Sequence, residues 1–365
     1  MTLAVNIAQG GSSNVTFRNR IINGGMVIDQ RNAGGVVTPS SNPTYTLDRW
    51  NLSFSQASKF TVQQTPSATE TGYATRVAAG FTNYLATTVA SSVSIGAGDY
   101  FVIQQQIEGY NIADLAWGTA NAKSVTLSFW AYSSLTGTFG GAINNSAGTA
   151  SYPFTYTISS ANTWTQISVT IAGNTSATWL STNGIGMYVR FGLGVGSTYS
   201  AASGSWAAGN YLSATGAVSV VGTGSATFYL TGVQLEAGTT ASPFEYRQYG
   251  TELALCQRYL PAFNLPSGGS YVGIASNWTT TQLMFTLPLQ TPTRTPATGI
   301  TLTGTYVYYC AGISTSGITL AFNSASNYAA NITVTGITSS TAGWAGQVFL
   351  SGASTGQILL TGCEL

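Results

Sequence analysis

The stretch LEAGTTASPFEYRQYGTELALCQRYL, Leu235–Leu260, decides how this chain is organised. It begins as the end of a β-strand and continues through a turn rich in Gly and Thr. Its last part places Leu253, Cys256 and Leu260 on one helical stripe. Because the surrounding sequence is β-rich on both sides, a helix at this point predicts a junction between two β-domains.

The helix of this stretch is predicted over residues 251–260. Thr251 is a suitable N-cap, and Pro261 is a residue that stops a helix. The Pro243–Phe244 pair before it is expected to begin a crossing segment that lays Phe244 on the core of the first domain. A second, shorter helical turn is expected near Ile112–Leu115.

Elsewhere the hydrophobic pattern has a period of two, which is typical of β-strands with one buried face. Four runs show it, and each is bounded by Gly, Asn or Ser: SVTLSFWAYS (124–133), TWTQISVTIAG (163–173), GIGMYVRFGLGVG (184–196) and ATFYLTGVQLEAG (226–238). Alternating runs separated by turn residues indicate antiparallel sheets in a β-sandwich. We therefore predict an all-β fold class.

The composition limits the kinds of partner. Charged residues are 6% of the chain, against roughly 25% in ordinary soluble domains. With 11 Lys plus Arg against 10 Asp plus Glu, the net charge is +1, and the basic residues are scattered. Nucleic acid is excluded as a partner on this pattern, because phosphate binding requires clustered positive charge. A near-zero net charge favours association into an oligomer.

The sequence shows no membrane or secretion signal. No apolar run approaches the roughly 18 to 20 residues of a spanning helix, so membrane insertion is not expected. The first residues carry no secretory signal pattern. The neutral, hydroxyl-rich composition is typical of extracellular or virion β-proteins, and release in a particle would reconcile the two observations.

Catalytic chemistry has few residues available. The chain has no histidine, which excludes Ser-His-Asp triads and most zinc sites. Its 3 cysteines have no CxxC spacing and form no disulfide framework. Two carboxylates would serve a glycosidase, but most of them sit near a basic residue, as Glu245 does near Arg247. An enzyme is therefore not expected.

Three separated stretches carry a family resemblance. They are NRIINGGMVIDQRNAG (19–34) with YTLDRW (45–50), QQQIEGYNIADLAWGTANAKSVTLSFW (104–130) and GVQLEAGTTASPFEYRQYGTELALCQRYL (232–260). Together they resemble tailed-bacteriophage tail-fibre and virion-fibre proteins with a carbohydrate-binding-module-like jelly-roll domain. The resemblance covers residues 17–260, whereas residues 261–365 are similar to the family in general plan alone.

The resemblance implies a fibre protein of the virion, located on the tail or the head. It implies a homotrimer that is not an enzyme and that attaches to host cell-surface polysaccharide. The alternative is a structural or decorating virion protein of the same fold without a receptor role. In a trimer the helical stripe of Leu253, Cys256 and Leu260 would face neighbouring chains near the axis, and otherwise it would cover its own sandwich.

The expected domain order follows from these arguments. Residues 1–20 form an N-terminal virion-attachment segment, 21–250 the jelly roll, 251–260 a linker helix and 261–365 a C-terminal β-sandwich domain. The first segment fits a strand donated to another virion protein, and it also fits an edge strand of its own sandwich.

Sugar binding uses aromatic faces together with amide and hydroxyl groups. Two groups of aromatic residues on expected loops are candidates for glycan binding: Tyr199, Trp206 and Tyr211 in the first domain, and Tyr271, Trp278 and Trp344 in the second. In a sandwich protein such residues also serve as core or subunit interface.

A further set of residues is assigned to structure. It comprises Asp29, Arg31, Asp48, Arg49, Trp50, Glu236 and Phe244. Trp50 is expected to fill the core, while Asp48 and Arg49 tie a strand start to the Asp-Gln-Arg segment at 29–31, with Asp48 paired to Arg31.

Proteins of the resembled kind often hold calcium between an acidic loop and the last strand. Here Val27 replaces the acidic ligand of the loop, so we expect no metal or other cofactor, although Glu236 on the last strand is still available as a ligand.

Overall fold

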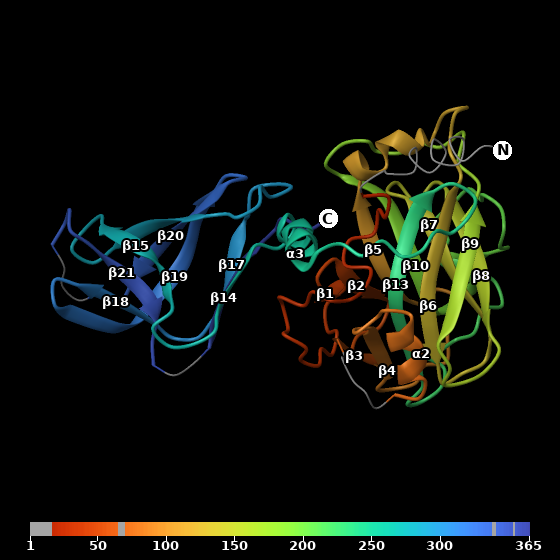
Figure 1. Cartoon of the computed structure of the whole chain (residues 1–365), viewed down its shortest axis with the longest axis horizontal. Helices are drawn as coiled ribbons and strands as arrows, with labels where there is room; N and C mark the ends of the chain where they lie inside the picture. Colours follow the sequence, from red (N-terminus) through yellow and green to blue (C-terminus); the bar gives the residue numbers. More distant parts are fainter. Residues whose placement is uncertain (1–16, 65–69, 338–340, 353–354) are drawn as a thin grey trace, which may run out of the picture. The chain divides into compact units, whose positions relative to one another are not determined.

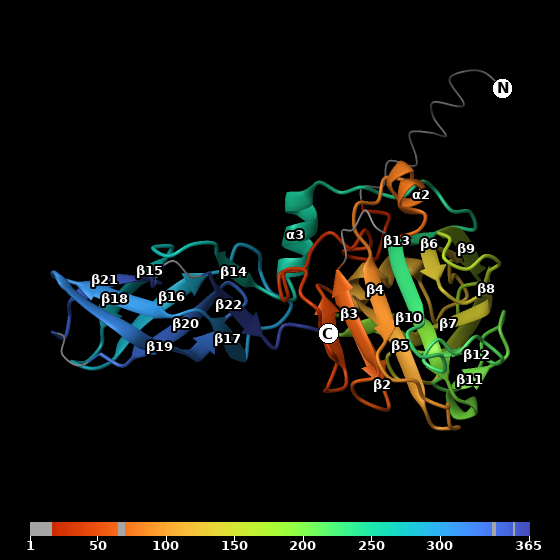
Figure 2. The same ribbon diagram turned by 90° about the horizontal axis from the view of Figure 1, so that it is seen from below.

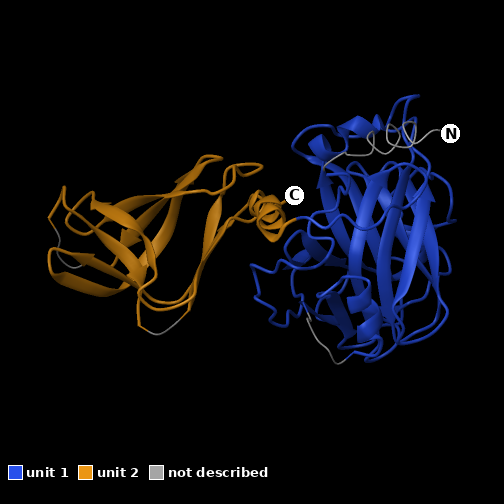
Figure 3. Cartoon of the chain, in the orientation of Figure 1, with its two compact units in different colours: residues 1–247 blue, residues 248–365 orange. Residues whose placement is uncertain are grey.

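The computed structural model describes residues 17–64, 70–337, 341–352 and 355–365. The chain divides into two compact units, Met1–Arg247 and Gln248–Leu365, which Figure 3 shows in two colours. The segment expected to attach to the virion, residues 1–20, lies outside the described residues except for its last four positions. Each unit is considered by itself.

The N-terminal unit is an antiparallel jelly-roll β-sandwich of two sheets (Figure 1). The first sheet has the strand order β1 (Thr44–Leu47), β2 (Trp50–Phe54), β5 (Tyr100–Glu108), β10 (Ile185–Val195), β7 (Gly137–Asn145) and β8 (Ser151–Ile158). The second has the order β3 (Phe60–Gln64), β4 (Leu85–Val89), β13 (Thr227–Ala237), β6 (Val125–Ser133) and β9 (Thr165–Ile171). The four strands predicted from alternation are thus confirmed as β6, β9, β10 and β13.

The core of this unit lies between the two sheets. Phe129 of β6 and Phe191 of β10 come from opposite sheets, and their ring centroids are 5.0 Å apart in an edge-to-face arrangement. Trp50 of β2 is fully buried, and its ring lies 6.4 Å from that of Phe191. Large alternating side chains from both sheets therefore interlock, as the period-two pattern predicts.

Short elements complete the unit. They are α2 (Tyr73–Ala78), the 3-10 turns η1 (Gly109–Asn111), η2 (Ala113–Leu115) and η3 (Ser197–Tyr199), and the paired strands β11 (Ser200–Ala201) and β12 (Ser213–Ala214). The helical turn expected near Ile112–Leu115 exists as η2, preceded by η1. Both are tight turns that follow β5 and carry the chain toward β6.

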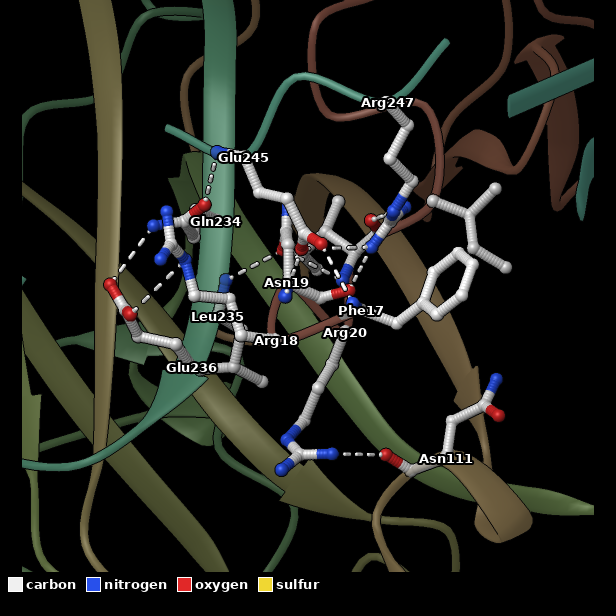
Figure 4. A network of polar contacts seen from close by, with 12 residues as sticks. Phe17, Arg18, Asn19, Arg20, Asn111, Gln234, Leu235, Glu236, Glu245 and Arg247 are labelled. Carbon is white, nitrogen blue, oxygen red and sulfur yellow. Dashed lines mark hydrogen bonds and ion pairs between the residues drawn. The ribbon is translucent and has the colours of Figure 1, made fainter. Parts of the chain in front are cut away.

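The stretch that follows β13 ties the end of the jelly roll to its beginning. The carboxylate of Glu245 accepts the backbone N–H groups of Phe17 (2.8 Å) and Asn19 (2.6 Å), as Figure 4 shows. Asn19 in turn accepts the Leu235 N–H through Oδ1 at 3.0 Å and donates to the Val233 carbonyl at 3.1 Å. Two of the stretches that carry the family resemblance are therefore one structural junction.

The helix after this junction is α3, Tyr249–Gln257. It begins two residues before the predicted start, with Gln248 at the N-cap, so the expectation that Thr251 caps it is wrong. The Thr251 N–H donates to the Gln248 carbonyl at 2.9 Å, which places Thr251 inside the first turn. Since the boundary between the units falls before Gln248, the helix belongs to the C-terminal unit and is not a separate linker.

The predicted stripe of the helix is partly buried. Cys256 and Leu260 are buried, but Leu253 is half-buried. Its neighbour in sequence, Glu252, is buried instead. Leu260 itself lies beyond the last helical residue. No described helix of the chain is long and apolar enough to cross a membrane.

The C-terminal unit contains a three-stranded sheet and a closed barrel. The sheet has the order β14 (Ala262–Leu265), β22 (Gly356–Thr361) and β17 (Gly299–Thr303). The barrel has the order β15 (Tyr271–Asn277), β16 (Leu283–Pro288), β20 (Ala329–Thr335), β19 (Ile313–Ala325), β18 (Tyr306–Cys310) and β21 (Ala345–Leu350). Figure 2 shows the three-stranded sheet next to α3 and the barrel strands beyond it.

Residues 261–365, for which the sequence predicts a β-sandwich, form this barrel together with the three-stranded sheet. Closure depends on β21, which pairs with β15 on one side and with β18 on the other. The interior is filled by alternate side chains such as Ala275, Phe285 and Val348, all of them buried. A sandwich and a small barrel show the same alternation in sequence, and the long-range pairing of β15 with β21 separates them.

Candidate functional site

One end of the barrel gathers three chain reversals. The strands β15, β18 and β20 end there, and their antiparallel partners β16, β19 and β21 begin there. The connections to the three-stranded sheet leave from the opposite end, because they join the starts of β15 and β18 and the ends of β16 and β21. The first end is therefore free of the connections that join the barrel to the three-stranded sheet.

A pocket of about 330 Å³ opens at this end. We call it the barrel mouth, and it is defined by Tyr308, Cys310, Ile313, Thr315, Ile337, Thr341 and Trp344. The register of β18 against β19 pairs Cys310 with Ile313 and Tyr308 with Thr315, so these residues share the inner face of the barrel. Trp344 is 49% exposed and Ile313 is 57% exposed.

The floor of the barrel mouth is polar and hydrogen-bonded. The Tyr308 hydroxyl donates to Asn277 Oδ1 at 2.7 Å, and Asn277 Nδ2 donates to the Thr341 carbonyl at 2.9 Å. Burial raises the pKa of Tyr308 above its ordinary value, so its hydroxyl stays protonated at neutral pH. This chain of bonds fixes Thr341, and through it the segment that carries Trp344.

The Tyr308 ring fits because a glycine faces it. A methyl group added at Gly346 of β21 would lie 2.6 Å from the Tyr308 ring and 2.4 Å from the Tyr309 carbonyl oxygen. Such distances are closer than nonbonded atoms allow. Gly346 therefore gives the barrel room for an aromatic floor beneath the mouth.

The two tryptophans predicted as glycan-binding residues of the second domain both lie at this end. Asn277 N–H donates to the Trp344 carbonyl at 2.7 Å, and Gly343 N–H donates to the Asn277 carbonyl at 2.9 Å. Trp278 follows Asn277 directly and is 70% exposed at the turn between β15 and β16. The structure therefore brings Trp278 and Trp344 together on neighbouring backbone segments.

Tyr271, the third candidate of this unit, lies elsewhere. It starts β15 and so sits at the opposite end of the barrel, where its ring packs at 6.1 Å from Phe349. It is 69% exposed. The geometry separates Tyr271 from the barrel mouth.

The loop of the N-terminal unit is bound closely to its own sheet. Trp206 packs edge-on against Trp117 (5.4 Å), Trp179 (5.6 Å) and Tyr152 (5.3 Å), and its indole N–H donates to the Ala172 carbonyl at 2.8 Å. The ring and its polar group are therefore engaged in packing. This geometry favours a structural role for Trp206 over a stacking platform for a ligand.

The other two aromatic residues of that loop are also tied down. The Tyr199 ring meets Tyr100 at 5.3 Å, and its carbonyl accepts the Leu212 N–H at 2.7 Å. The Tyr211 N–H donates to Ser151 Oγ at 2.9 Å. Both side chains are half-buried, and as sugar-binding residues they remain predictions.

The Asp-Gln-Arg segment is joined to the Asp-Arg-Trp segment through Gln30. Asp48 is buried and accepts hydrogen bonds from the Gln30 N–H (2.6 Å) and from Gln30 Nε2 (2.7 Å). Burial raises the pKa of Asp48, while the bonds from Gln30 act in the opposite direction. The charge of Arg31 also acts to lower the pKa of Asp48, and a direct pair between the two residues stays a prediction.

The remaining members of this structural set also have defined partners. Asp29 accepts the backbone N–H groups of Asn32 (3.0 Å) and Gly34 (2.8 Å). The guanidinium of Arg31 lies 5.3 Å from the centroid of the Tyr45 ring. Arg49 is buried and donates to the Gln106 carbonyl, and the Trp50 indole N–H donates to the Asn23 carbonyl at 3.0 Å.

Glu236, the remaining acidic residue at the position considered for calcium, accepts several hydrogen bonds within the chain. Glu236 accepts from Gln234 Nε2 (2.9 Å), from the Ser242 N–H (2.8 Å) and from Ser242 Oγ (2.6 Å). Arg18 Nε lies 3.9 Å from its second oxygen. Phe244, from the same segment, meets Phe81 edge-to-face at 5.0 Å and is half-buried.

Several residues of the barrel mouth are absent from the sequence-based candidates. Tyr308, Cys310, Ile313, Thr315, Ile337 and Thr341 come from two regions of the chain, and neither region alone suggests a ligand. The available signal is the alternation of Tyr306, Tyr308 and Cys310 in YVYYC, which puts these three side chains on one face. The closure of the barrel is needed to bring that face next to Trp344.

No protein-family model and no curated protein matches this chain. Among solved structures it is similar to the enzymatically active domain of tailspike protein 4 from bacteriophage CBA120. The identity is 12%, with a TM-score of 0.31 and coverage of 60% of this chain and 22% of that one.

Two further similar structures are carbohydrate-binding modules. TmCBM61 in complex with β-1,4-galactotriose is 9% identical, with a TM-score of 0.31 and coverage of 60% of this chain and 99% of that one. The family 11 module from Clostridium thermocellum in complex with a mixed-linked tetrasaccharide is 12% identical, with a TM-score of 0.27 and coverage of 55% and 100%. Because these identities and TM-scores are low, the function has to be inferred from the chain's own residues.

Proposed function

We propose that this chain is a non-enzymatic fibre protein of a bacteriophage virion, and that it attaches to host-surface glycan through the barrel mouth. The observation that carries the binding site is the exposed indole of Trp344 beside a pocket of about 330 Å³. The virion role is supported by the resemblance of residues 17–260 to phage fibre proteins.

The residues of the barrel mouth match the chemistry of a sugar. A hexose ring has an apolar face of C–H groups, which stacks on an aromatic side chain, and a rim of hydroxyl groups. Trp344 and Ile313 supply apolar surface, and Thr315 and Thr341 supply hydroxyl-bearing side chains. Trp278 at the adjacent turn adds a second exposed indole for a longer glycan.

The rigid floor supports this assignment. An exposed aromatic platform binds best when its backbone is already fixed, because the ordering cost is then small. The hydrogen bonds that join Tyr308, Asn277 and Thr341 provide that rigidity. A single small site binds weakly, and an oligomer that presents several copies would gain avidity through effective concentration.

The test is binding of the full-length protein to a glycan array, followed by a comparison of variants. Trp344→Ala should abolish binding to the glycans of the array that the wild-type protein binds. Tyr328→Ala is the matched control, because Tyr328 is 68% exposed in the turn between β19 and β20 at the opposite end of the barrel.

Two outcomes contradict the proposal. Binding that survives Trp344→Ala and disappears with Trp206→Ala would move the site to the jelly roll. The absence of glycan binding by a correctly assembled oligomer would favour the structural or decorating role instead.

A further inference from the structure

We infer that the barrel mouth is specific for uncharged sugars and rejects acidic ones such as uronic acids. This inference rests on the proposed function and names its ligand class. It starts from the distribution of charge in the C-terminal unit, which is set by the sequence. The charged residues of residues 248–365 are Glu252, Arg258, Arg294 and Glu364.

All four charged residues lie away from the barrel mouth. Glu252 is in α3 and Arg258 follows it directly. Arg294 lies in the connection between β16 and β17, which leaves from the opposite end of the barrel, and Glu364 follows β22. No strand of the barrel carries a charged side chain.

Hydrogen bonds also join Arg294 to the backbone of Arg258 and of the segment that contains Glu364. The Arg294 N–H donates to the Arg258 carbonyl at 2.9 Å, and the Arg294 guanidinium donates to the carbonyls of Cys363 (3.0 Å) and Glu364. Arg258, Arg294 and Glu364 are thus held together away from the barrel mouth. A seven-residue strand such as β15 spans roughly 23 Å, whereas the Debye length is about 8 Å at physiological ionic strength. Little of their field reaches the mouth.

The lining of the barrel mouth offers no compensation for a charged ligand. Its described residues are Tyr308, Cys310, Ile313, Thr315, Ile337, Thr341 and Trp344, and none of them is a Lys, Arg, Asp or Glu residue. The raised pKa of Tyr308 keeps its hydroxyl neutral, and that hydroxyl already donates to Asn277. A carboxylate placed here would lose water without gaining a cation, which is strongly unfavourable.

An uncharged sugar incurs no such cost. Its hydroxyl groups exchange bonds to water for bonds to threonine side chains and backbone groups, and its C–H face covers Trp344. Binding of this kind depends little on ionic strength, because no counterions are released and no charges are screened. Insensitivity to salt is therefore a second property of the site.

The experiment uses the full-length protein and matched pairs of oligosaccharides that differ in one terminal residue, a neutral hexose or the corresponding uronic acid. The hexose form is expected to bind at least about tenfold more tightly. Its affinity is expected to stay within about twofold between low and high salt. Both measurements are repeated with Trp344→Ala, which should lose the binding.

A charge-insertion variant gives an independent readout. Thr315→Lys places a cation at the barrel mouth and should raise the affinity for the uronic-acid form relative to the hexose form by several-fold. Tyr328→Lys, at the other end of the barrel, is the matched control and should leave the ratio unchanged.

The possible failures are distinguishable. Equal or tighter binding of the acidic form, falling steeply with salt and lost in Trp344→Ala, overturns the neutral specificity and leaves glycan binding at the mouth in place. Binding unaffected by Trp344→Ala overturns the assignment of the site. If neither form binds and no glycan is bound at all, the proposed function fails and this inference fails with it.

Discussion

Glu245 accepts the backbone N–H of Asn19 at 2.6 Å although the two residues are 226 positions apart in sequence. The other oxygen of the same carboxylate accepts the Phe17 N–H at 2.8 Å, while Arg247 Nη2 lies 3.6 Å from the oxygen that accepts the Asn19 N–H. One side chain after the last strand of the jelly roll thereby fixes the first described residues of the chain. This explains why the stretch before α3 contains the charged residues Glu245 and Arg247 in a chain that has few charged residues.

The first prediction concerns this junction. Glu245→Ala leaves the N–H of the buried Asn19 without its acceptor and removes the carboxylate that lies 3.6 Å from Arg247. We expect the free energy of unfolding of the N-terminal unit to fall by about 2–4 kcal/mol. Calorimetry of the full chain measures this, and the amide of Asn19 should lose protection in hydrogen exchange.

Asp114→Asn provides the control for this prediction. Asp114 pairs with Arg20 at 2.8 Å, but its side chain is 56% exposed. An exposed ion pair contributes about 0–1 kcal/mol. If both variants destabilise the unit equally, Glu245 contributes no more than an exposed ion pair does, and the prediction is wrong.

The second prediction separates structural tryptophans from binding ones. Trp206→Ala removes the edge-on contacts to Trp117, Trp179 and Tyr152 and the bond to the Ala172 carbonyl. We expect the N-terminal unit to lose about 2–4 kcal/mol of stability, with glycan binding retained. Trp344→Ala should show the reverse, because its exposed ring covers little core. Thermal unfolding and array binding of both variants check this, and loss of binding with unchanged stability in Trp206→Ala contradicts it.

The third prediction concerns the barrel floor. Gly346→Ala drives a methyl group into the Tyr308 ring and the Tyr309 carbonyl, so the C-terminal unit should lose about 1–3 kcal/mol and the sugar affinity should fall. Gly250→Ala is the control in the same unit. A methyl group there meets no described atom within 4 Å, and the residue lies in α3. That change should stabilise the unit by up to about 1 kcal/mol. Opposite shifts of the calorimetric transition are expected.

The fourth prediction concerns pH. Burial raises the pKa of Asp48 above its ordinary value of 3.8. Between that value and the raised one, the native state binds more protons than the unfolded state, so the stability contributed by Asp48 falls as pH rises through this window. Relative to Asp48→Asn, the wild-type protein should therefore gain stability as pH is lowered toward 3.8, by at most about 1.4 kcal/mol per pH unit.

Asp99 serves as the comparison with the opposite sign. Hydrogen bonds from Gln56, from the Gly96 N–H and from Ser55 lower the pKa of Asp99. Its stabilising contribution is present above the ordinary value and is lost as pH falls through the lowered pKa. Relative to Asp99→Asn, the wild-type protein should lose stability under acid conditions. Parallel pH dependences of the two pairs would contradict the assigned directions.

Much of the fold was predictable from local sequence. The alternation in 124–133 and 226–238 predicted β6 and β13 closely, because a half-buried strand must place every second side chain in the core. The start of α3 was missed because Thr251 looks like a cap, although the turn begins with Gln248. Closure of the barrel was not predictable, since it depends on β15 pairing with β21 far along the chain.

The candidate site was predictable in part for the same reason. Trp278 and Trp344 stand out as aromatic residues on loops, and the structure places both at one end of the barrel. Trp206 stands out equally, yet it packs into a cluster of tryptophans. Composition does not distinguish an exposed indole from a buried one, and Thr315 and Thr341 have no distinguishing pattern at all. Long-range packing decides each case.

Binding at the barrel mouth is tested most directly by following the indole N–H signals of the tryptophans by NMR. An oligosaccharide that binds on the glycan array is titrated into the full-length protein. The chain has 8 tryptophans, and Phe substitutions assign their signals. Binding at the barrel mouth predicts shifts for Trp344 and Trp278, with Trp206, Trp117 and Trp179 unchanged. Shifts of the Trp206 group with a stationary Trp344 signal would contradict binding at the barrel mouth and place the ligand on the jelly roll.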